Sequence, residues 1–218
     1  MKRIVKGKEP SSLTEHRTSQ HSSYANLNKD GVRASLLAEQ GHLCCYCMKR
    51  IPESNKTPGS KIEHFLCQDD YRQEELNYSN MLLACLGNEG SPKTLQTCDT
   101  FKGNKSLCLN PSSNDRNIEG LINYKANGEI YSNDEQLNNE LNSVLNLNMQ
   151  SLKRNRQVIY EEVQNRIRLE GKRQKNHTLK RRFLENEKQK WLALNQSKYS
   201  EFCMVGVYVI EKKLKKLG

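Results

Sequence analysis

The sequence predicts an α+β fold, with short strands and loops in the first part of the chain and helices in the last part. Three observations support this. Residues 44–110 are rich in Cys, Gly and Asn and contain only short apolar runs. Asn127-Gly128 lies between two short β-prone runs, which is typical of a tight hairpin. After Asp134, apolar residues recur at helical spacing.

The flanking segments are predicted as follows. Residues 1–30 are polar with weak periodicity, and we expect an extended arm. Residues 32–40 predict a short helix that Gly41 ends. After Asp134, the apolar spacing predicts a long helix with a stripe from Leu137 to Ile167 and a break at residues 171–176. Two more helices are expected at residues 179–194 and 201–217, with Trp191 in their core. The chain thus divides into an arm with its helix, a Cys-rich core, and a hairpin followed by basic helices, at residues 1–43, 44–110 and 111–218.

Charge is concentrated at the C-terminal end. The chain has 218 residues and a net charge of +10, and residues 151–218 hold 18 Lys and Arg against 7 Asp and Glu. Such a block indicates either a phosphate-rich or acidic partner, or simply a solvated helical surface. No apolar run approaches the roughly 20 residues of a membrane span, and residues 1–10 lack the apolar stretch of a secretory signal. We expect a cytoplasmic protein.

Eight cysteines in a reducing compartment favour metal binding over disulfides. Cys44 and Cys47 form a Cys-x-x-Cys turn, which can place two thiolates on one zinc ion. We choose Cys85, which ends an apolar run, and Cys98, which opens a predicted helix, as the other two ligands. The remaining cysteines are expected to be free thiols, with Cys67 the nearest alternative ligand; they are Cys45, Cys67, Cys108 and Cys203.

Glu63-His64 lies on a predicted strand between the two pairs of cysteines. Strand alternation puts the two side chains on opposite faces, but both can flank one phosphate if the strand twists or ends there. A carboxylate can hold Mg²⁺, and a neutral imidazole can take a proton from water. The alternative is a surface pair without function.

The order Cys-x-x-Cys, Glu-His, Asn before an apolar run and Cys, then Cys-Asp-x-x-Lys resembles the pattern of HNH endonucleases. That family has a ββα-metal core. The resemblance implies that His64 is the general base, that Glu63 and Asp99 bind a catalytic Mg²⁺ or Mn²⁺, and that Asn80 braces the loop that orients the base. It also implies a structural zinc ion on Cys44, Cys47, Cys85 and Cys98. The family usually has Asp or His in place of Glu63, and His or Asn in place of Asp99. The plainer alternatives are a helix cap for Asp99 and an ordinary loop residue for Asn80.

Further segments resemble the HNH subunit of Septu anti-phage systems, in the version carried beside retrons. They are Met1-Lys2-Arg3-Ile4 with Glu9-Pro10, Leu36-Leu37-Ala38, Cys98-Asp99-x-x-Lys102-Gly103-Asn104 and Leu145-Asn146-Leu147-Asn148. This resemblance implies an ABC- or SMC-like ATPase partner, and a retron reverse transcriptase whose RNA–DNA product restrains the nuclease. Whether the substrate is DNA or RNA, including tRNA, stays open.

Two other classes of function compete with a nuclease: a zinc-ribbon module that binds nucleic acid without cutting it, and an adaptor that binds a protein. Basic residues near the predicted helix break are expected to contact nucleic acid or a partner; they are Lys172, Arg173, Lys175, Lys180, Arg181 and Arg182. Lys102 could contact phosphate or remain solvated. His16 and His21 are read as surface residues that could also touch nucleic acid.

Overall fold

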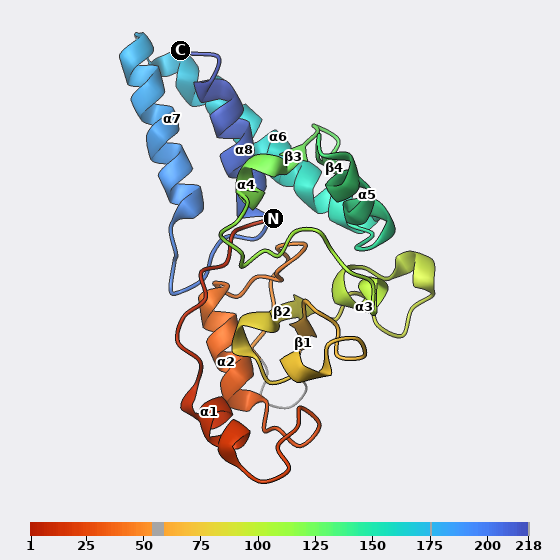
Figure 1. The fold of residues 1–218 in the computed structure, drawn as a ribbon. Helices are drawn as coiled ribbons and strands as arrows, with labels where there is room; N and C mark the ends of the chain where they lie inside the picture. Colours follow the sequence, from red (N-terminus) through yellow and green to blue (C-terminus); the bar gives the residue numbers. More distant parts are fainter. Residues whose placement is uncertain (54–58, 175, 218) are drawn as a thin grey trace.

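The computed structural model describes residues 1–53, 59–174 and 176–217, and shows an α+β protein with two small antiparallel sheets. Figure 1 shows two regions: α1, α2, the β1–β2 sheet and α3 lie in one, and α6, α7 and α8 lie in the other. The helices are α1 (Ser11–Thr18), α2 (Asp30–Glu39), α3 (Cys98–Lys102), α4 (Ile118–Leu121), α5 (Glu135–Ser143), α6 (Gln150–Arg173), α7 (His177–Leu192) and α8 (Cys203–Leu214). The strands are β1 (Ser60–His64), β2 (Met81–Cys85), β3 (Asn123–Tyr124) and β4 (Ile130–Tyr131), and short 3₁₀ turns occur at Arg72–Glu74, Tyr78–Asn80 and Lys93–Leu95.

The expectation of an extended N-terminal arm is wrong for Ser11–Thr18, which form α1. Pro10 precedes this helix with φ −67°, a value already suited to helix entry. Leu13 is fully buried, and α1 packs on α2. A helix of two turns depends on tertiary packing. Because Leu13 is the one residue that α1 buries, the sequence shows no apolar periodicity from which this helix could be predicted.

The α2 helix agrees with its prediction, and the chain turns at Gly41 with φ +53°. A Cβ atom at Gly41 would lie 2.3 Å from the ring of Tyr199. Gly41 therefore serves both the left-handed turn and a close approach of the C-terminal region.

The hairpin around Asn127-Gly128 is confirmed. Tyr124 pairs with Ile130, and Gly128 has φ +77°. A Cβ atom at Gly128 would lie 1.9 Å from the carbonyl oxygen of Lys153. The hairpin therefore packs directly on the backbone of α6.

The single long helix expected from Leu137 to Ile167 is wrong, because it is split into α5 and α6. Asn146 lies between them with φ +48°, and its amide donates to the carbonyls of Thr94 and Gln96. Asn148 bonds both the N–H and the carbonyl of Ile130. These side chains satisfy the backbone of other segments, which interrupts the helix while the apolar stripe stays buried.

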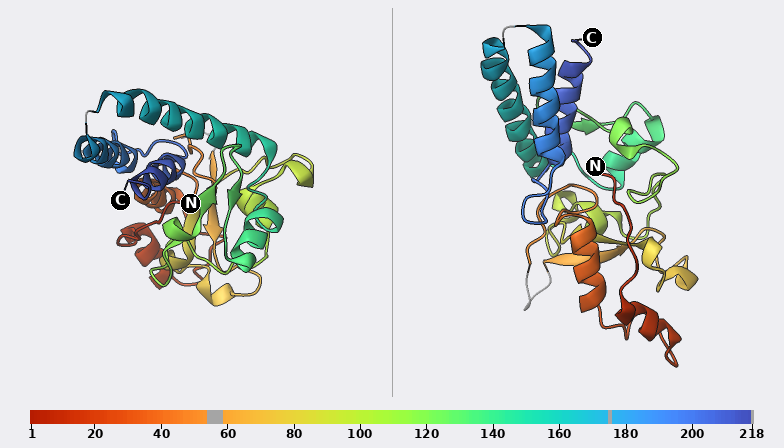
Figure 2. Two further views of the ribbon diagram at one scale, coloured as in Figure 1. Left: turned by 90° about the horizontal axis from the view of Figure 1, so that it is seen from above. Right: turned by 90° about the vertical axis from the view of Figure 1, so that its left-hand side faces the viewer.

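Both C-terminal helices pack beside α6, and α8 lies in contact with α6 and α7 (Figure 2). The apolar face of α8 is buried, including Val205, Val209 and Ile210. Trp191 of α7 packs against Gly206 of α8, as expected for a core residue. The apolar stripes of these helices thus cover one another. Within the described residues, no helix has the length and apolar character needed to span a membrane.

Candidate functional site

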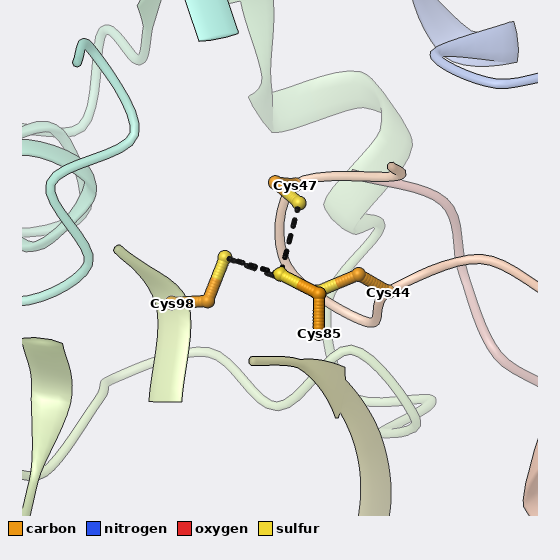
Figure 3. A group of neighbouring side chains, drawn as sticks. All are labelled: Cys44, Cys47, Cys85 and Cys98. Atoms are coloured by element: carbon orange, nitrogen blue, oxygen red, sulfur yellow. Dashed lines mark hydrogen bonds between the residues drawn. The ribbon is translucent and has the colours of Figure 1, made fainter. Parts of the chain in front are cut away.

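Four cysteine side chains from three parts of the chain meet at one point (Figure 3). Cys44 and Cys47 lie on the turn after α2, Cys85 ends β2, and Cys98 opens α3. Their sulfur atoms all lie within 4.8 Å of one another, and three pairs, Cys44–Cys98, Cys47–Cys85 and Cys85–Cys98, are 3.8 Å apart. Thiolates about 2.3 Å from a tetrahedral zinc ion would be about 3.8 Å apart. The group can hold a metal ion such as zinc.

Backbone hydrogen bonds shape the Cys44–Cys47 turn. The N–H of Met48 donates to the carbonyl of Cys44, and Met48 adopts φ +63°. The N–H of Cys45 donates to Leu83 of β2, which ties the turn to the sheet. Burial opposes ionisation of the Cys44 thiol, but hydrogen bonds from the neighbouring thiols lower its pKa well below the ordinary value.

The other four cysteines lie outside this group. The Cys67 thiol donates to Asp70 at 3.1 Å. All eight cysteines are free of disulfides, as the sequence predicted.

Glu63 lies at the centre of a buried polar cluster beside the cysteine group. Only 3% of its surface is exposed, and its Oε1 accepts hydrogen bonds from the Tyr46 hydroxyl at 2.7 Å and Lys102 Nζ at 2.9 Å. Burial and the adjacent Asp99 carboxyl raise the pKa of Glu63 well above its ordinary value, although Lys102 opposes the shift. The cluster thus sets two neighbouring carboxyl groups against one ammonium group, which occupies Oε1 of Glu63.

Lys102 is not the solvated residue that the sequence allowed. It is 2% exposed and bonds Glu63, and its Nζ also lies 3.5 Å from the His64 carbonyl oxygen. The α3 helix is only five residues long, and Asp99 and Lys102 stand one turn apart on it. That spacing puts both on the face toward β1.

His64 is the last residue of β1 and is 6% exposed. Its Nε2 donates to the Glu75 carbonyl at 2.9 Å. Because a carbonyl can only accept, this bond selects the tautomer with a free lone pair on Nδ1. The Gln68 side-chain amide donates to that nitrogen at 2.8 Å, and the Tyr24 ring packs edge-on at 4.6 Å. Burial lowers the pKa of His64.

Asn80 closes the loop between β1 and β2. Its side chain accepts from the N–H of Leu66 at 2.8 Å and donates to the Leu66 carbonyl at 3.0 Å. It is 5% exposed, so these bonds lie in a dry setting. The loop that Asn80 holds carries both Gln68 and Glu75.

Sequence reasoning missed Tyr24, Gln68 and Glu75, which surround His64, and Tyr46, which bonds Glu63. Tyr46 stands inside the Cys-x-x-Cys turn, so its position was a signal that it lies near the site. Gln68, four residues after His64, and Tyr24, in the N-terminal arm, gave no comparable signal. Their roles depend on the loop path and on α1–α2 packing.

Arg156 of α6 was also missed, and it is 1% exposed. Its guanidinium donates to the carbonyls of Gly128 and Leu147, each at 2.7 Å. In the described ranges it has no carboxylate partner. Burial lowers its pKa. This side chain therefore joins the β3–β4 hairpin to the loop before α6.

The structure exposes the described members of the predicted basic cluster at the α6–α7 junction. Arg173 pairs with Glu170 at 2.9 Å, and Arg181 pairs with Glu185 at 3.0 Å. Lys172, Lys180 and Arg182 are exposed. Lys175, the remaining member, lies outside the described residues.

Comparison with models of known protein families gave no match, and no curated protein proved significantly similar.

Proposed function

We propose that this protein is a metal-dependent HNH-type endonuclease with a structural zinc ion. The observation that carries the proposal is the Glu63-His64 pair at the end of β1, with Asp99 and Lys102 of α3 against Glu63, beside four cysteines. A binding module needs the cysteines but has no need of a buried carboxyl group, Glu63, next to a histidine in sequence. Burying a carboxyl group is costly unless it is paired, and contacts to Lys102 and Tyr46 offset that cost for Glu63. A zinc ribbon that only binds does not need such a cluster, which favours catalysis over binding alone.

His64 supplies the general base. The Glu75 carbonyl keeps the proton on Nε2, so Nδ1 can accept the proton of an attacking water. The imidazolium that results keeps its bond to Glu75. Gln68 occupies the Nδ1 direction at 2.8 Å, and its flexible side chain must yield or share that position with water.

Glu63 and Asp99 would hold the catalytic Mg²⁺ or Mn²⁺. When bound, such an ion stabilises the negative charge that develops on the leaving oxygen. Lys102 keeps positive charge against Glu63 and limits repulsion between the two carboxylates. Asn80 fixes the loop that carries Glu75, and thus the orientation of His64.

Zinc on Cys44, Cys47, Cys85 and Cys98 would be structural. A site with four thiolates leaves no open position for substrate or water. It joins the turn after α2, the end of β2 and the start of α3, which are the segments that carry or flank the proposed active site.

The biological setting is proposed from the resemblance to Septu HNH subunits. We propose a cytoplasmic effector of anti-phage defence, which acts with an ABC- or SMC-like ATPase and is restrained by a retron reverse transcriptase and its RNA–DNA product. The substrate is DNA or RNA. Contacts to a phosphate backbone alone do not choose a sequence.

The test is incubation of the purified protein, alone and with its co-expressed partners, with total RNA and with phage DNA. Reactions contain Mg²⁺, Mn²⁺ or EDTA. Cleavage with either metal and none in EDTA is expected. Binding of nucleic acid without cleavage in every metal condition would instead favour the zinc-ribbon module.

A further inference from the structure

A groove lies at the C-terminal end of the molecule, where α6, α7 and the end of α8 come together. It has a volume of about 700 Å³. The helices that form it lie at the opposite end of the molecule from β1 and β2 (Figure 1). Both α6 and α7 pack on α8 more than on each other, which leaves the space between them open.

The walls of this groove are basic, and its lining contains no acidic residue. Six exposed cations line it: Arg168, Lys172, Lys180, Lys212, Lys213 and Lys216. Some nearby cations outside the lining are paired with glutamates, such as Arg166 with Glu187 and Lys188 with Glu211. Within the described part of the chain, none of the six groove cations forms an ion pair. The groove therefore gathers six cations that have no carboxylate partner among the described residues, while others, such as Arg182 and Lys215, lie outside its lining.

The floor of the groove is apolar. Ile167 of α6, Phe183 of α7 and Val209 of α8 contribute to it. Ile167 and Phe183 are only partly buried, so apolar surface stays open between rows of cations. Apolar surface framed by charge of one sign fits an amphipathic helix of opposite charge, whose apolar residues enter the groove while its acidic residues meet the rim.

We propose that this groove binds an acidic amphipathic helix of a partner protein. Nucleic acid fits it less well, because a phosphate backbone gains nothing from an apolar floor and the groove lies away from the proposed active site. Charge complementarity would speed encounter, and the apolar floor would supply most of the affinity. The choice of a peptide over nucleic acid rests in part on the proposed position of the active site, whereas the binding test below does not depend on nuclease activity.

The test measures binding of a labelled 20-residue Ala-rich helical peptide to the full-length protein by fluorescence anisotropy. The peptide carries Leu at helical spacing on one face and Glu on the flanks. Binding is compared with that of two altered peptides and two nucleic acids. The altered peptides are a scrambled peptide of the same composition and a peptide with Leu replaced by Ser. The nucleic acids are a 20-nucleotide single-stranded RNA and a duplex DNA of the same length. We expect the amphipathic peptide to bind at least about tenfold more tightly than either altered peptide, because apolar anchors dominate such interfaces.

Two charge-reversal variants test whether the peptide binds in the groove. Lys180→Glu with Lys213→Glu changes the groove, and Arg182→Glu with Lys215→Glu makes the same change in net charge at exposed positions outside its lining. The groove variant should weaken peptide binding about tenfold, and the control variant less than about twofold. Methyl NMR signals of Ile167 should move on peptide addition. Equal weakening by both variants, equal binding of scrambled and amphipathic peptides, or binding of nucleic acid alone would overturn the proposal.

Discussion

His64 takes its proposed role from the groups that surround it. The Glu75 carbonyl fixes the tautomer, Gln68 meets the lone pair, and the Tyr24 ring shields one side. Each contact holds an imidazole that is nearly inaccessible to solvent. The residue is therefore oriented by loop and arm segments that are distant in sequence.

Replacing His64 with Ala should lower the cleavage rate about 10²–10⁴-fold, because a general base typically contributes that much. The fold should survive, since the side chain bonds only a carbonyl and a glutamine. Single-turnover cleavage and the far-ultraviolet circular dichroism spectrum are the measurements. A folded variant that cuts at nearly the wild-type rate would remove His64 from the mechanism.

The pH profile follows from the lowered pKa of His64. A base must be neutral to accept a proton, and the ordinary histidine pKa is about 6.5. Because burial moves the pKa of His64 below that value, cleavage should persist as the pH falls to about 6.5 and decline only below it. The profile is measured at saturating Mg²⁺, so that protonation of Glu63, whose pKa is raised, does not limit metal binding. An acidic limb of kcat/KM that begins above pH 7 would contradict this assignment.

Lys102→Ala should lower the free energy of unfolding by about 3 kcal/mol, because it leaves Glu63 buried without its cation. Lys105→Ala is the matched control, since Lys105 is exposed on the segment that follows the same helix. Its effect should stay within about 0.5 kcal/mol. Urea denaturation measures the free energy of unfolding of both variants. An equal decrease in the two would mean that the Lys102–Glu63 contact does not stabilise the fold.

At the scale of elements, β1, β2 and α3 are short, and Cys85 ends β2 while Cys98 opens α3. Serine in place of Cys85 or Cys98 should remove the bound zinc and unfold the core, because a structural zinc site contributes folding free energy. Cys67→Ser is the control and should keep one zinc per chain. Zinc content by elemental analysis and solubility are measured for all three. Normal zinc in the Cys85 and Cys98 variants would show that other residues hold the ion.

Some elements could be predicted from the sequence and others could not. Asn127-Gly128 and the residues of α2 and α7 signalled their structure locally. The split between α5 and α6 depends on bonds from Asn146 and Asn148 to distant loops, so apolar spacing alone predicted one helix. At the site, cysteine spacing and Glu63-His64 were visible, but Gln68 and Tyr24 reach His64 through a loop and an arm whose paths no local pattern specifies.

At the scale of the whole molecule, the C-terminal segment supports the cysteine turn. The N–H of Phe202 donates to the Met48 carbonyl, and the N–H of Arg50 donates to the Glu201 carboxylate at 2.7 Å. Arg50 also bonds the carbonyl of Tyr199. The two regions in Figure 1 therefore meet at the turn that carries Cys44 and Cys47.

Truncation after Gln174, which removes α7 and α8, should therefore impair zinc retention as well as the helical bundle. It exposes buried core residues such as Leu43 and Met48, which pack within the same apolar cluster as α8. We expect an insoluble product, or one with less than one zinc per chain. A soluble truncated protein with full zinc content would show that the core folds independently of these helices.

The most direct test of the proposed function is single-turnover cleavage by the wild-type protein and by His64→Ala protein on one nucleic-acid substrate, in Mg²⁺ and in EDTA, at matched zinc content. The expected result is metal-dependent cleavage by the wild-type protein and at least about a hundredfold slower cleavage by the variant. Equal cleavage by the two proteins, or cleavage that persists in EDTA while zinc is retained, would contradict an HNH-type mechanism at this site.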